Sequence, residues 1–452
     1  MDIIIAGLGA IGLTIMQELS REGHNIVVVD TNSQKVEDAI NAYDVNGVIG
    51  NCASSEVLKE AGVSTADLIV ATTSVDELNI LCCIIANKLG VKKTIARVSK
   101  PEYSDLFENE GDLGLSLMVN PQYEAAIEIS RMLRFPSAIK VNQFSGGKVE
   151  LVEFRVPEHS PLISLSLKDL SKKFKTKVLI CAAQRDGKAI IPSGDFVIEQ
   201  EDRLFLTATT RNIALFFKEL GWNKQSKSVI IVGGSTTAYY LCEELARVGG
   251  IRIKIIDKSK KKCLSLADSL DKVEVVCGDG TDQELLADEG LEYTDAFVAL
   301  GHQDEQNIIM SMFAASHGVP KVVTKIDQLS YYDMLQRSGI YSAVSTKNST
   351  ADQIVRFVRT LDNEEESDSV KRIFHIIDDT TEILEFTATE TFKKFGVKIM
   401  DLSLKKNLLV AGIIRSGVLI TPSGQDTIEK DDNVIIVTKE EGFSNLNDIL
   451  DL

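Results

Sequence analysis

A glycine-rich segment near the start of the chain has the residue types and the spacing that hold the phosphates of a nucleotide. Residues 7–12 read Gly-Leu-Gly-Ala-Ile-Gly and directly follow the apolar residues 3–6. Gly7 permits a tight turn, Gly9 lets a pyrophosphate approach the backbone without meeting a Cβ, and Gly12 allows a helix to pack closely on a sheet. The amides at the start of that helix donate to the phosphates, so such a site needs no excess of basic residues.

An acidic residue stands where this kind of site binds the ribose. Asp30 ends a second apolar run, 18 residues after Gly12, and its carboxylate is able to accept both ribose hydroxyls. The same charge repels a 2′-phosphate, which favours NAD(H) or an adenine nucleotide over NADP(H). Strand, glycines, helix and distal carboxylate together form the dinucleotide-binding fingerprint, whereas the glycines alone are weak evidence. The alternative is a structural turn with an incidental aspartate.

The chain contains two copies of one unit. The segment from Gly50 to Asn79 recurs from Gly278 to Asn307 at a constant offset of 228 residues. Both copies end in an Asp-Glu-x-Asn sequence, at residues 76–79 and 304–307. At an offset of 230, further matches keep step later in the chain: Arg185 with Arg415, Gly187 with Gly417, and Asp202 with Asp432.

The second copy keeps only part of the phosphate-binding segment. Residues 233–238 read Gly-Gly-Ser-Thr-Thr-Ala, so Ser235 and Ala238 replace the second and third glycines. Ala238 is small enough for helix packing, but Ser235 places a Cβ where a pyrophosphate comes closest, while its hydroxyl is able to hydrogen-bond a phosphate oxygen. Whether this copy binds a nucleotide stays open, and we expect a weaker or altered site. Its candidate contacts are Gly233, Ser235, Thr236, Asp257, Asp279 and Gly280.

Polar residues at the ends of two further apolar runs are candidates for the same site. Arg97 lies late in the first copy's predicted sheet, at the edge where phosphates would lie, and Lys325 occupies the equivalent position in the second copy. The alternative is an ordinary surface charge at a strand end. Thr73 and Ser74 follow another strand and either donate to a ribose or cap the helix that begins at Asp76.

The elements that must position these residues alternate between strands and helices in the first part of each copy. Such alternation predicts right-handed βαβ units and a parallel sheet covered on both faces. In the first copy the predicted strands are residues 3–6, 26–29, 68–71 and 94–98, and the predicted helices include residues 13–21 and 77–88.

The second part of each copy is dominated by strand patterns and turn residues such as Arg185-Asp186-Gly187 and Arg415-Ser416-Gly417, which predicts small α+β modules. The fold class is therefore α/β, with two tandem repeats of a Rossmann-like lobe and a small α+β lobe. The predicted domains are residues 1–136, 137–224, 225–361 and 370–452.

Two segments connect these parts. Residues 120–134 form a predicted helix opened by Asn120-Pro121 and closed before Phe135-Pro136, and this helix either bridges lobes or exchanges between subunits. The acidic run at residues 362–368 is interpreted as a solvated linker rather than a binding tail.

Composition excludes several other classes of protein. The 452 residues are 44% hydrophobic and 25% charged, which is globular composition, and the net charge of −17 argues against nucleic-acid binding. No run approaches 18 apolar residues and Met1 nearly abuts an apolar run, so we expect a soluble cytoplasmic chain without a signal peptide. Seven cysteines without a CxxC pair and five scattered histidines argue against a disulfide framework or a zinc site. Cys82 and Cys83 are interpreted as packing residues.

Several of these features point to one family. They are the duplicated order of lobes, the fingerprint ending at Asp30, the repeated segments at residues 50–62 and 278–290, the Asp-Glu-x-Asn pairs and Arg97. In all of them the chain resembles the tandem RCK/KTN family of Trk-type potassium uptake systems. This resemblance spans essentially the whole chain. It implies a cytoplasmic ring of lobes that binds NAD(H) or adenine nucleotides (ATP or ADP) and changes the conductance of a membrane potassium-translocating subunit. Eight lobes would need four chains, so a homotetramer is expected at the inner face of the membrane.

The resemblance also assigns candidate nucleotide contacts in the first copy. They are Gly7, Leu8, Gly9, Ala10, Ile11, Asp30, Thr73, Ser74 and Arg97. Gly12, Asn51 and Cys52 complete the candidate contacts of this copy.

An NAD-dependent oxidoreductase is the alternative, because the same fingerprint serves hydride transfer. Such an enzyme needs a general acid or base beside the nicotinamide. His159 and His375 are the only histidines of the two strand-rich parts, and they do not correspond in the repeat. We therefore expect a chain that is not an enzyme.

Overall fold

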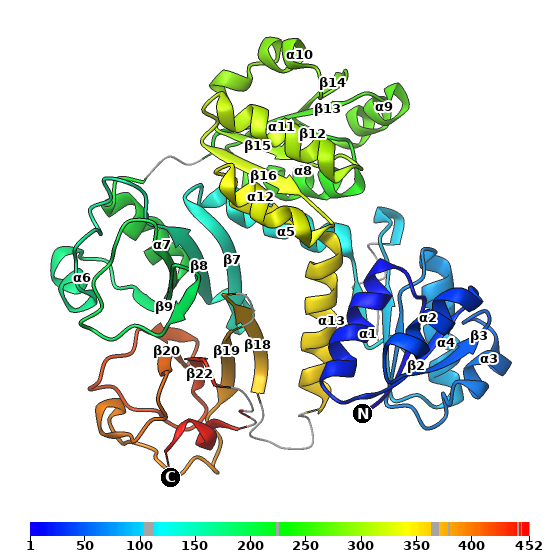
Figure 1. The fold of residues 1–452 in the computed structure, drawn as a ribbon, viewed down its shortest axis with the longest axis horizontal. Helices are drawn as coiled ribbons and strands as arrows, with labels where there is room; N and C mark the ends of the chain where they lie inside the picture. Colours follow the sequence, from blue (N-terminus) through cyan, green and yellow to red (C-terminus); the bar gives the residue numbers. More distant parts are fainter. Residues whose placement is uncertain are drawn as a thin grey trace. The chain divides into compact units, whose positions relative to one another are not determined.

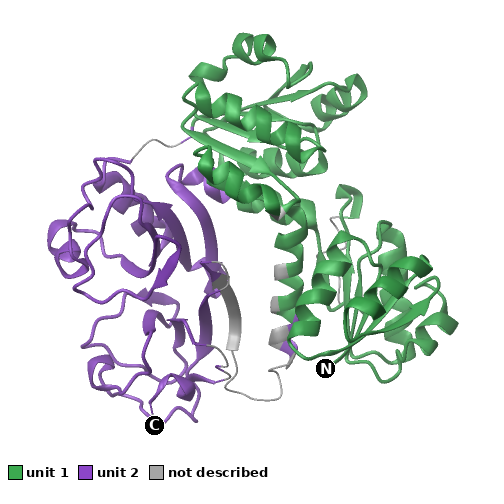
Figure 2. Cartoon of the chain, viewed as in Figure 1, with its two compact units in different colours: residues 1–130, 227–357 green, residues 131–226, 358–452 purple. Residues whose placement is uncertain are grey.

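The chain divides into two compact units, each built from both halves of the sequence (Figure 2). The computed structural model describes residues 1–103, 113–222, 226–362, 370–377, 380–440, 443 and 445–451 (Figure 1). Residues 1–130 and 227–357 form the first unit, and residues 131–226 and 358–452 form the second. The two α/β lobes therefore pack together, as do the two strand-rich lobes. The predicted acidic linker lies, from residue 363 on, outside the described residues.

The first α/β lobe is a six-stranded parallel sheet in the Rossmann order β3-β2-β1-β4-β5-β6. Its strands are β1 (Asp2–Ala6), β2 (Asn25–Asp30), β3 (Asn46–Ile49), β4 (Leu68–Ala71), β5 (Lys93–Arg97) and β6 (Leu117–Val119). Its helices are α1 (Ala10–Arg21), α2 (Ser33–Ala42), α3 (Ser55–Glu60), α4 (Asp76–Leu89) and α5 (Pro121–Arg134). Successive residues 3–6 point to opposite faces and are all buried, so both faces of the sheet are covered.

The second α/β lobe repeats this topology as β14-β13-β12-β15-β16-β17, also entirely parallel. Its strands are β12 (Ser228–Val232), β13 (Arg252–Asp257), β14 (Val273–Cys277), β15 (Ala296–Ala299), β16 (Lys321–Lys325) and β17 (Ser342–Val344). Its helices are α8 (Thr236–Val248), α9 (Lys260–Ser269), α10 (Gln283–Asp288), α11 (Asp304–Ser316), α12 (Tyr332–Arg337) and α13 (Thr346–Asp362). In both lobes the strand order reverses beside the first strand, and ligands of open α/β sheets bind at that point.

The predicted helix at residues 120–134 connects the two α/β lobes. Asn120 Oδ1 caps α5 by accepting from the amides of Gln122 (3.1 Å) and Tyr123 (3.0 Å). The Asn120 Nδ2 group donates to the hydroxyl of Tyr240 on α8 at 2.9 Å, and the rings of Tyr123 and Tyr240 meet edge to face. Of the two predicted roles for this helix, bridging between lobes of one chain is the one seen.

The strand-rich lobes are antiparallel five-stranded sheets. The first has the order β10-β9-β11-β8-β7 and the second β18-β19-β22-β20-β21. The first contains β7 (Ala138–Phe144), β8 (Val149–Arg155), β9 (Leu179–Arg185), β10 (Lys188–Ile190), β11 (Arg203–Ala208), α6 (Leu167–Lys173) and α7 (Thr210–Glu219). The second contains β18 (Val370–Ile376), β19 (Thr381–Thr387), β20 (Leu408–Arg415), β21 (Val418–Ile420) and β22 (Asn433–Thr438). The predicted turns are confirmed, since Asp186, Gly187, Ser416 and Gly417 all have positive φ between paired strands.

Candidate nucleotide sites

The glycine loop of the first α/β lobe joins β1 to α1 and has the predicted turn and packing. Gly7 has a φ of +98°, and a Cβ there would lie 2.7 Å from the amide nitrogen of Thr73. A Cβ on Gly12 would lie 2.0 Å from the carbonyl oxygen of Gly7, because α1 starts directly against the loop. Both positions therefore require glycine for the fold itself.

Gly9 is different, because the space beside it is open. It is the N-cap residue of α1, and a Cβ built on it would meet no atom within 4 Å. Since glycine has no side chain to cap a helix, the first amides of α1 are free to donate to an anion. Ala10 is exposed and Ile11 half-buried at this helix end, whereas the side chain of Leu8 is buried.

Asp30 holds the glycine loop in place, a role that the sequence analysis missed. Its Oδ2 accepts from the amide of Leu8 at 2.7 Å, and its Oδ1 accepts from the amide of Asn32 at 2.9 Å. Each carboxylate oxygen has a second lone pair, so the group is still able to accept from ribose hydroxyls. Asp257 repeats this arrangement in the second lobe with the amides of Gly234 (2.7 Å) and Ser259 (2.7 Å).

Thr73 and Arg97 lie side by side at the end of the first sheet. The Arg97 guanidinium donates through Nη1 to the Thr73 carbonyl at 2.8 Å, while its buried Nε has no hydrogen-bond partner. Burial lowers the pKa of Arg97, and the carboxylate of Asp76 opposes that shift. Thr73 lies against Gly7, so this hydrogen bond connects the Arg97 cation to the glycine loop.

The structure places the side chains of Thr73 and Ser74 in different surroundings. The Thr73 hydroxyl donates to Asn79 Oδ1 at 2.6 Å and accepts from the amide of Val75 at 3.3 Å, so it is occupied by the start of α4. The N-cap residue of α4 is Val75 rather than either predicted residue. Ser74 is exposed, and its hydroxyl is the one of the pair that remains at the surface of the loop.

Asn51 and Cys52, two other candidates of the first lobe, differ in how far their side chains are buried. Asn51 is exposed, and its Oδ1 accepts from the amide of Ala53 at 2.9 Å. Cys52 is 4% exposed and belongs to the hydrophobic core of the lobe. The Cys52 side chain therefore packs in the core, and of this residue only the backbone is left to contact a nucleotide.

The Asp-Glu-x-Asn pairs brace the loops around each site. Asn79 accepts from the amide of Thr73 at 2.8 Å and donates to the carbonyls of Thr73 (3.1 Å) and Arg97 (2.9 Å). Asp76 Oδ2 accepts from the amides of Ser99 and Lys100, both at 2.9 Å. The repeat identified these residues, but their backbone partners are recognisable only in the fold.

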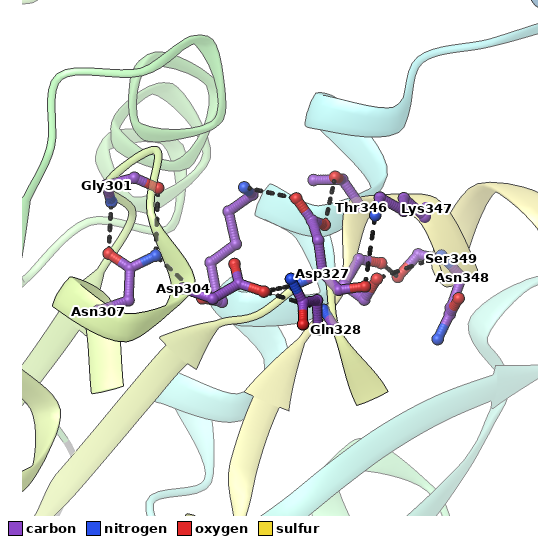
Figure 3. A network of polar contacts seen from close by, with 11 residues as sticks. Gly301, Asp304, Asn307, Asp327, Gln328, Thr346, Lys347, Asn348 and Ser349 are labelled. Atoms are coloured by element: carbon purple, nitrogen blue, oxygen red, sulfur yellow. Dashed lines mark hydrogen bonds and ion pairs between the residues drawn. The ribbon is translucent and has the colours of Figure 1, made fainter. Parts of the chain in front are cut away.

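Figure 3 shows the same brace in the second lobe. Asn307 accepts from the amide of Gly301 at 2.8 Å and donates to the carbonyls of Gly301 (3.1 Å) and Lys325 (3.0 Å). Asp304 accepts from the amides of Asp327 (2.8 Å) and Gln328 (2.9 Å).

Replacing Asn79 with leucine should destabilise the first lobe and weaken nucleotide binding there. The change leaves the Thr73 amide and the Arg97 carbonyl without the Asn79 partner, while the Thr73 carbonyl keeps only Arg97, for an expected loss of about 2–4 kcal/mol in the free energy of unfolding. Arg97 also loses the contact that fixes its strand end. Calorimetric unfolding and nucleotide titration measure the two effects. Asn307→Leu is the matched control, because it should cost similar stability while leaving first-site affinity unchanged.

The second lobe has an open cavity at its glycine loop. It has a volume of about 300 Å³ and is lined by residues that include Gly233, Ser235, Asp257, Asp279 and Gly280. Gly233 has a φ of +102°, like Gly7. Thr236 is exposed on the first turn of α8 and does not line the cavity. Five of the six candidates of this copy are therefore brought together.

Ser235 and Lys325 are both engaged by the protein in this lobe. The Ser235 hydroxyl caps α8 by accepting from the amide of Ala238 at 3.3 Å, so the helix end that is free in the first lobe is capped here. Lys325 donates to the Asp327 carboxylate at 3.0 Å. Asp327 in turn accepts from the Thr346 hydroxyl at 3.3 Å, and its carbonyl accepts from Lys347 at 3.4 Å (Figure 3).

The chain matches two domain families, each of them twice. The TrkA-N domain matches residues 3–121 and 229–346, and the TrkA-C domain matches residues 151–221 and 383–451. No helix among the described residues is long and apolar enough to cross a membrane.

Curated relatives resemble the chain along nearly its whole length. The Trk system potassium uptake protein TrkA homolog of Archaeoglobus fulgidus is 30% identical over 99% of this chain and 100% of its own. The TrkA protein of Halomonas elongata is 31% identical over 96% of this chain and 95% of its own. Among solved structures, the GsuK channel bound to NAD has a TM-score of 0.64 at 17% identity, over 97% of this chain and 76% of that one.

Proposed function

Since the chain belongs to the TrkA family, shown by its two TrkA-N and two TrkA-C domains, we propose that it is a nucleotide-binding regulatory subunit of a potassium transport system. The observation that carries the proposal is the glycine cradle of the first lobe, where an uncapped helix start lies beside the carboxylate of Asp30, and where Thr73 joins the Arg97 cation to the loop. The oxidoreductase alternative receives no support, because the curated relatives are named as potassium uptake proteins.

The ligand proposed for the first site is NAD(H) or an adenine nucleotide such as ATP or ADP. The helix start donates to the phosphates, Arg97 adds a charge-assisted hydrogen bond, and Asp30 accepts from the ribose. The GsuK channel, which shares this fold, binds NAD. The residues proposed to contact the nucleotide are Gly7, Leu8, Gly9, Ala10, Ile11, Asp30, Asn51, Ser74 and Arg97.

Regulation requires that the nucleotide bind two arrangements of the lobes with different affinity. A coupling free energy of about 1–3 kcal/mol changes the equilibrium about 5- to 150-fold. Exchange of one adenine nucleotide for another would supply it by changing the contacts at the glycine loop. We propose that the chain acts on a Trk-type potassium-translocating membrane subunit, from the cytoplasmic face and as a tetramer that joins eight α/β lobes in a ring.

Gly9→Val tests the first site without disturbing the fold. The space at the Cβ position of Gly9 is open, so the chain should stay folded with only a small fall in the unfolding temperature from the less favourable N-cap, while nucleotide affinity at this site falls at least about tenfold because the phosphates lose their approach to the amides. Calorimetric titration with NAD, NADH, ADP and ATP measures the affinity. Unchanged affinity in a folded variant would rule the site out.

The regulatory role needs a separate measurement. Potassium flux through liposomes that contain the cognate translocating subunit should depend on this chain and on the nucleotide, and Gly9→Val should remove the dependence on the nucleotide. Flux that responds to no nucleotide with the wild-type chain would contradict the regulatory role.

A further inference from the structure

Two basic side chains from opposite walls meet across the cavity of the second α/β lobe. Lys262 projects from α9, and His302 follows β15, on the other side of the glycine loop. Lys262 Nζ lies 3.4 Å from His302 Nε2 and 3.9 Å from Asp257 Oδ2. An ammonium group only donates, so Nε2 is the acceptor and the imidazole carries its proton on Nδ1.

The second lobe lacks a counterpart of the Arg97 cation with an unused donor, and the Lys262–His302 pair lies at its site. Arg97 has an unused donor at the first site, but its counterpart Lys325 is bound to Asp327. The first lobe has Ser99 at the position of Asp327, and Lys35 and Ser74 at the positions of Lys262 and His302. Both lobes therefore have a lysine at the position of Lys262, and what distinguishes the second lobe is the histidine that meets this lysine.

The cavity is also shaped for a smaller ligand than a dinucleotide. Its volume of about 300 Å³ is at the lower end of the roughly 300–1,000 Å³ that is typical of ligand pockets. Ser235 places a side chain where the first lobe is open at Gly9, and the Lys262–His302 contact joins α9 to the segment after β15 within the cavity that both residues line.

Charged groups of both signs line the cavity beside this pair, and the carboxylates are already engaged by other donors. Lys258 also lines the cavity and is exposed. Asp279 points its Oδ1 away to the amide (3.0 Å) and hydroxyl (2.8 Å) of Thr281, and Asp257 holds the amides of Gly234 and Ser259. A phosphate oxygen is a stronger acceptor for an ammonium group than a neutral imidazole is, so Lys262 gains by turning to it.

We propose that Lys262 and His302 clamp the terminal phosphate of an adenosine di- or triphosphate in the second α/β lobe, and that this lobe selects such mononucleotides over dinucleotides. His302 donates from its Nε2–H tautomer once Lys262 has turned to the phosphate. The inference rests on the proposed nucleotide-dependent function and adds to it a second site with a preference for mononucleotides.

The test uses the full chain with Gly9→Val, so that only the second site is titrated. Calorimetry should find one equivalent of ADP bound, about tenfold or more tighter than NAD. Lys262→Gln and His302→Ser, the latter introducing the residue of the first lobe, should each weaken ADP binding about tenfold and change NAD binding less than about twofold. Lys261→Gln, an exposed neighbour on α9 outside the cavity lining, controls for net charge and should leave ADP affinity unchanged.

Equal affinity for NAD and ADP, or unchanged ADP affinity in both cavity variants, would overturn the inference. So would the absence of ADP binding in the Gly9→Val chain when the wild-type chain binds nucleotide at its first site. If the wild-type chain binds no nucleotide at all, the proposed function fails as well, so the two failures are told apart.

Discussion

Gly12→Ala should unfold the first α/β lobe under conditions where the wild-type chain is stable. The new Cβ would lie 2.0 Å from the Gly7 carbonyl oxygen and 2.9 Å from the Thr72 hydroxyl, and the first of these is backbone that cannot rotate away. Either α1 moves off the sheet or the glycine loop opens, for an expected loss of about 3–5 kcal/mol in the free energy of unfolding. Differential scanning calorimetry should show a lower transition temperature, and nucleotide binding at the first site should be lost with the loop geometry.

The second lobe supplies the control for this change. Ala238 is the native residue at the equivalent position and is fully buried, so that lobe already accommodates a methyl group. Ala238→Gly should therefore cost only about 1–2 kcal/mol, from helix propensity and a small cavity. A Gly12→Ala chain with wild-type stability would show that α1 and the loop are not in the tight contact described here.

The contrast between Gly9 and Gly12 shows how far sequence reasoning extends at this site. The fingerprint predicted a turn, an open approach and a close helix contact at the three glycines, and the geometry agrees for each. The parallel sheet and the repeat were predictable for the same reason, because periodicity and spacing are local properties of the sequence. The TrkA-N and TrkA-C matches confirm the tandem architecture.

Properties that depend on which groups meet in space were not predictable. Asp30 was identified as a ribose acceptor, yet both of its oxygens also hold backbone amides, and no spacing rule shows where those amides point. The repeat indicated that Lys325 is equivalent to Arg97, but in the structure Lys325 donates to the Asp327 carboxylate. Cys52 was chosen because it lies in the repeated segment at residues 50–62, but its side chain packs in the hydrophobic core of the lobe. The gathering of like lobes into one unit likewise follows from packing rather than from chain order.

Because of these differences, we expect the two α/β lobes to contribute differently to regulation. The first offers free helix amides and a cation with an unused donor, while the second has a capped helix, a bound lysine and a basic pair from other elements. Because coupling depends on differential affinity, two sites that differ in these contacts are not expected to respond equally to the same nucleotide.

Asp202→Ala should destabilise the first strand-rich lobe by about 3–5 kcal/mol, as expected when one partner of a buried ion pair is removed. The Asp202 side chain is 1% exposed and accepts from Arg185 Nε and Nη2, both at 2.7 Å, and from the amide of Glu199 at 2.8 Å. Without Asp202, the Arg185 guanidinium keeps only its more exposed contacts. Trp222 is the single tryptophan and packs on Phe154 and Phe217 of the same lobe, so its fluorescence in urea reports this transition.

Asp432→Ala tests whether the two strand-rich lobes unfold together. Asp432 makes the equivalent pair with Arg415, and the lobes share one core cluster that includes Phe205 and Ile435. Because that cluster loses packing when either lobe opens, the Trp222 transition should shift to lower urea in this variant too, although the mutation lies in the other lobe. A shift in Asp202→Ala alone would mean that the lobes unfold independently, and an unshifted transition in both variants would mean that neither ion pair stabilises the fold.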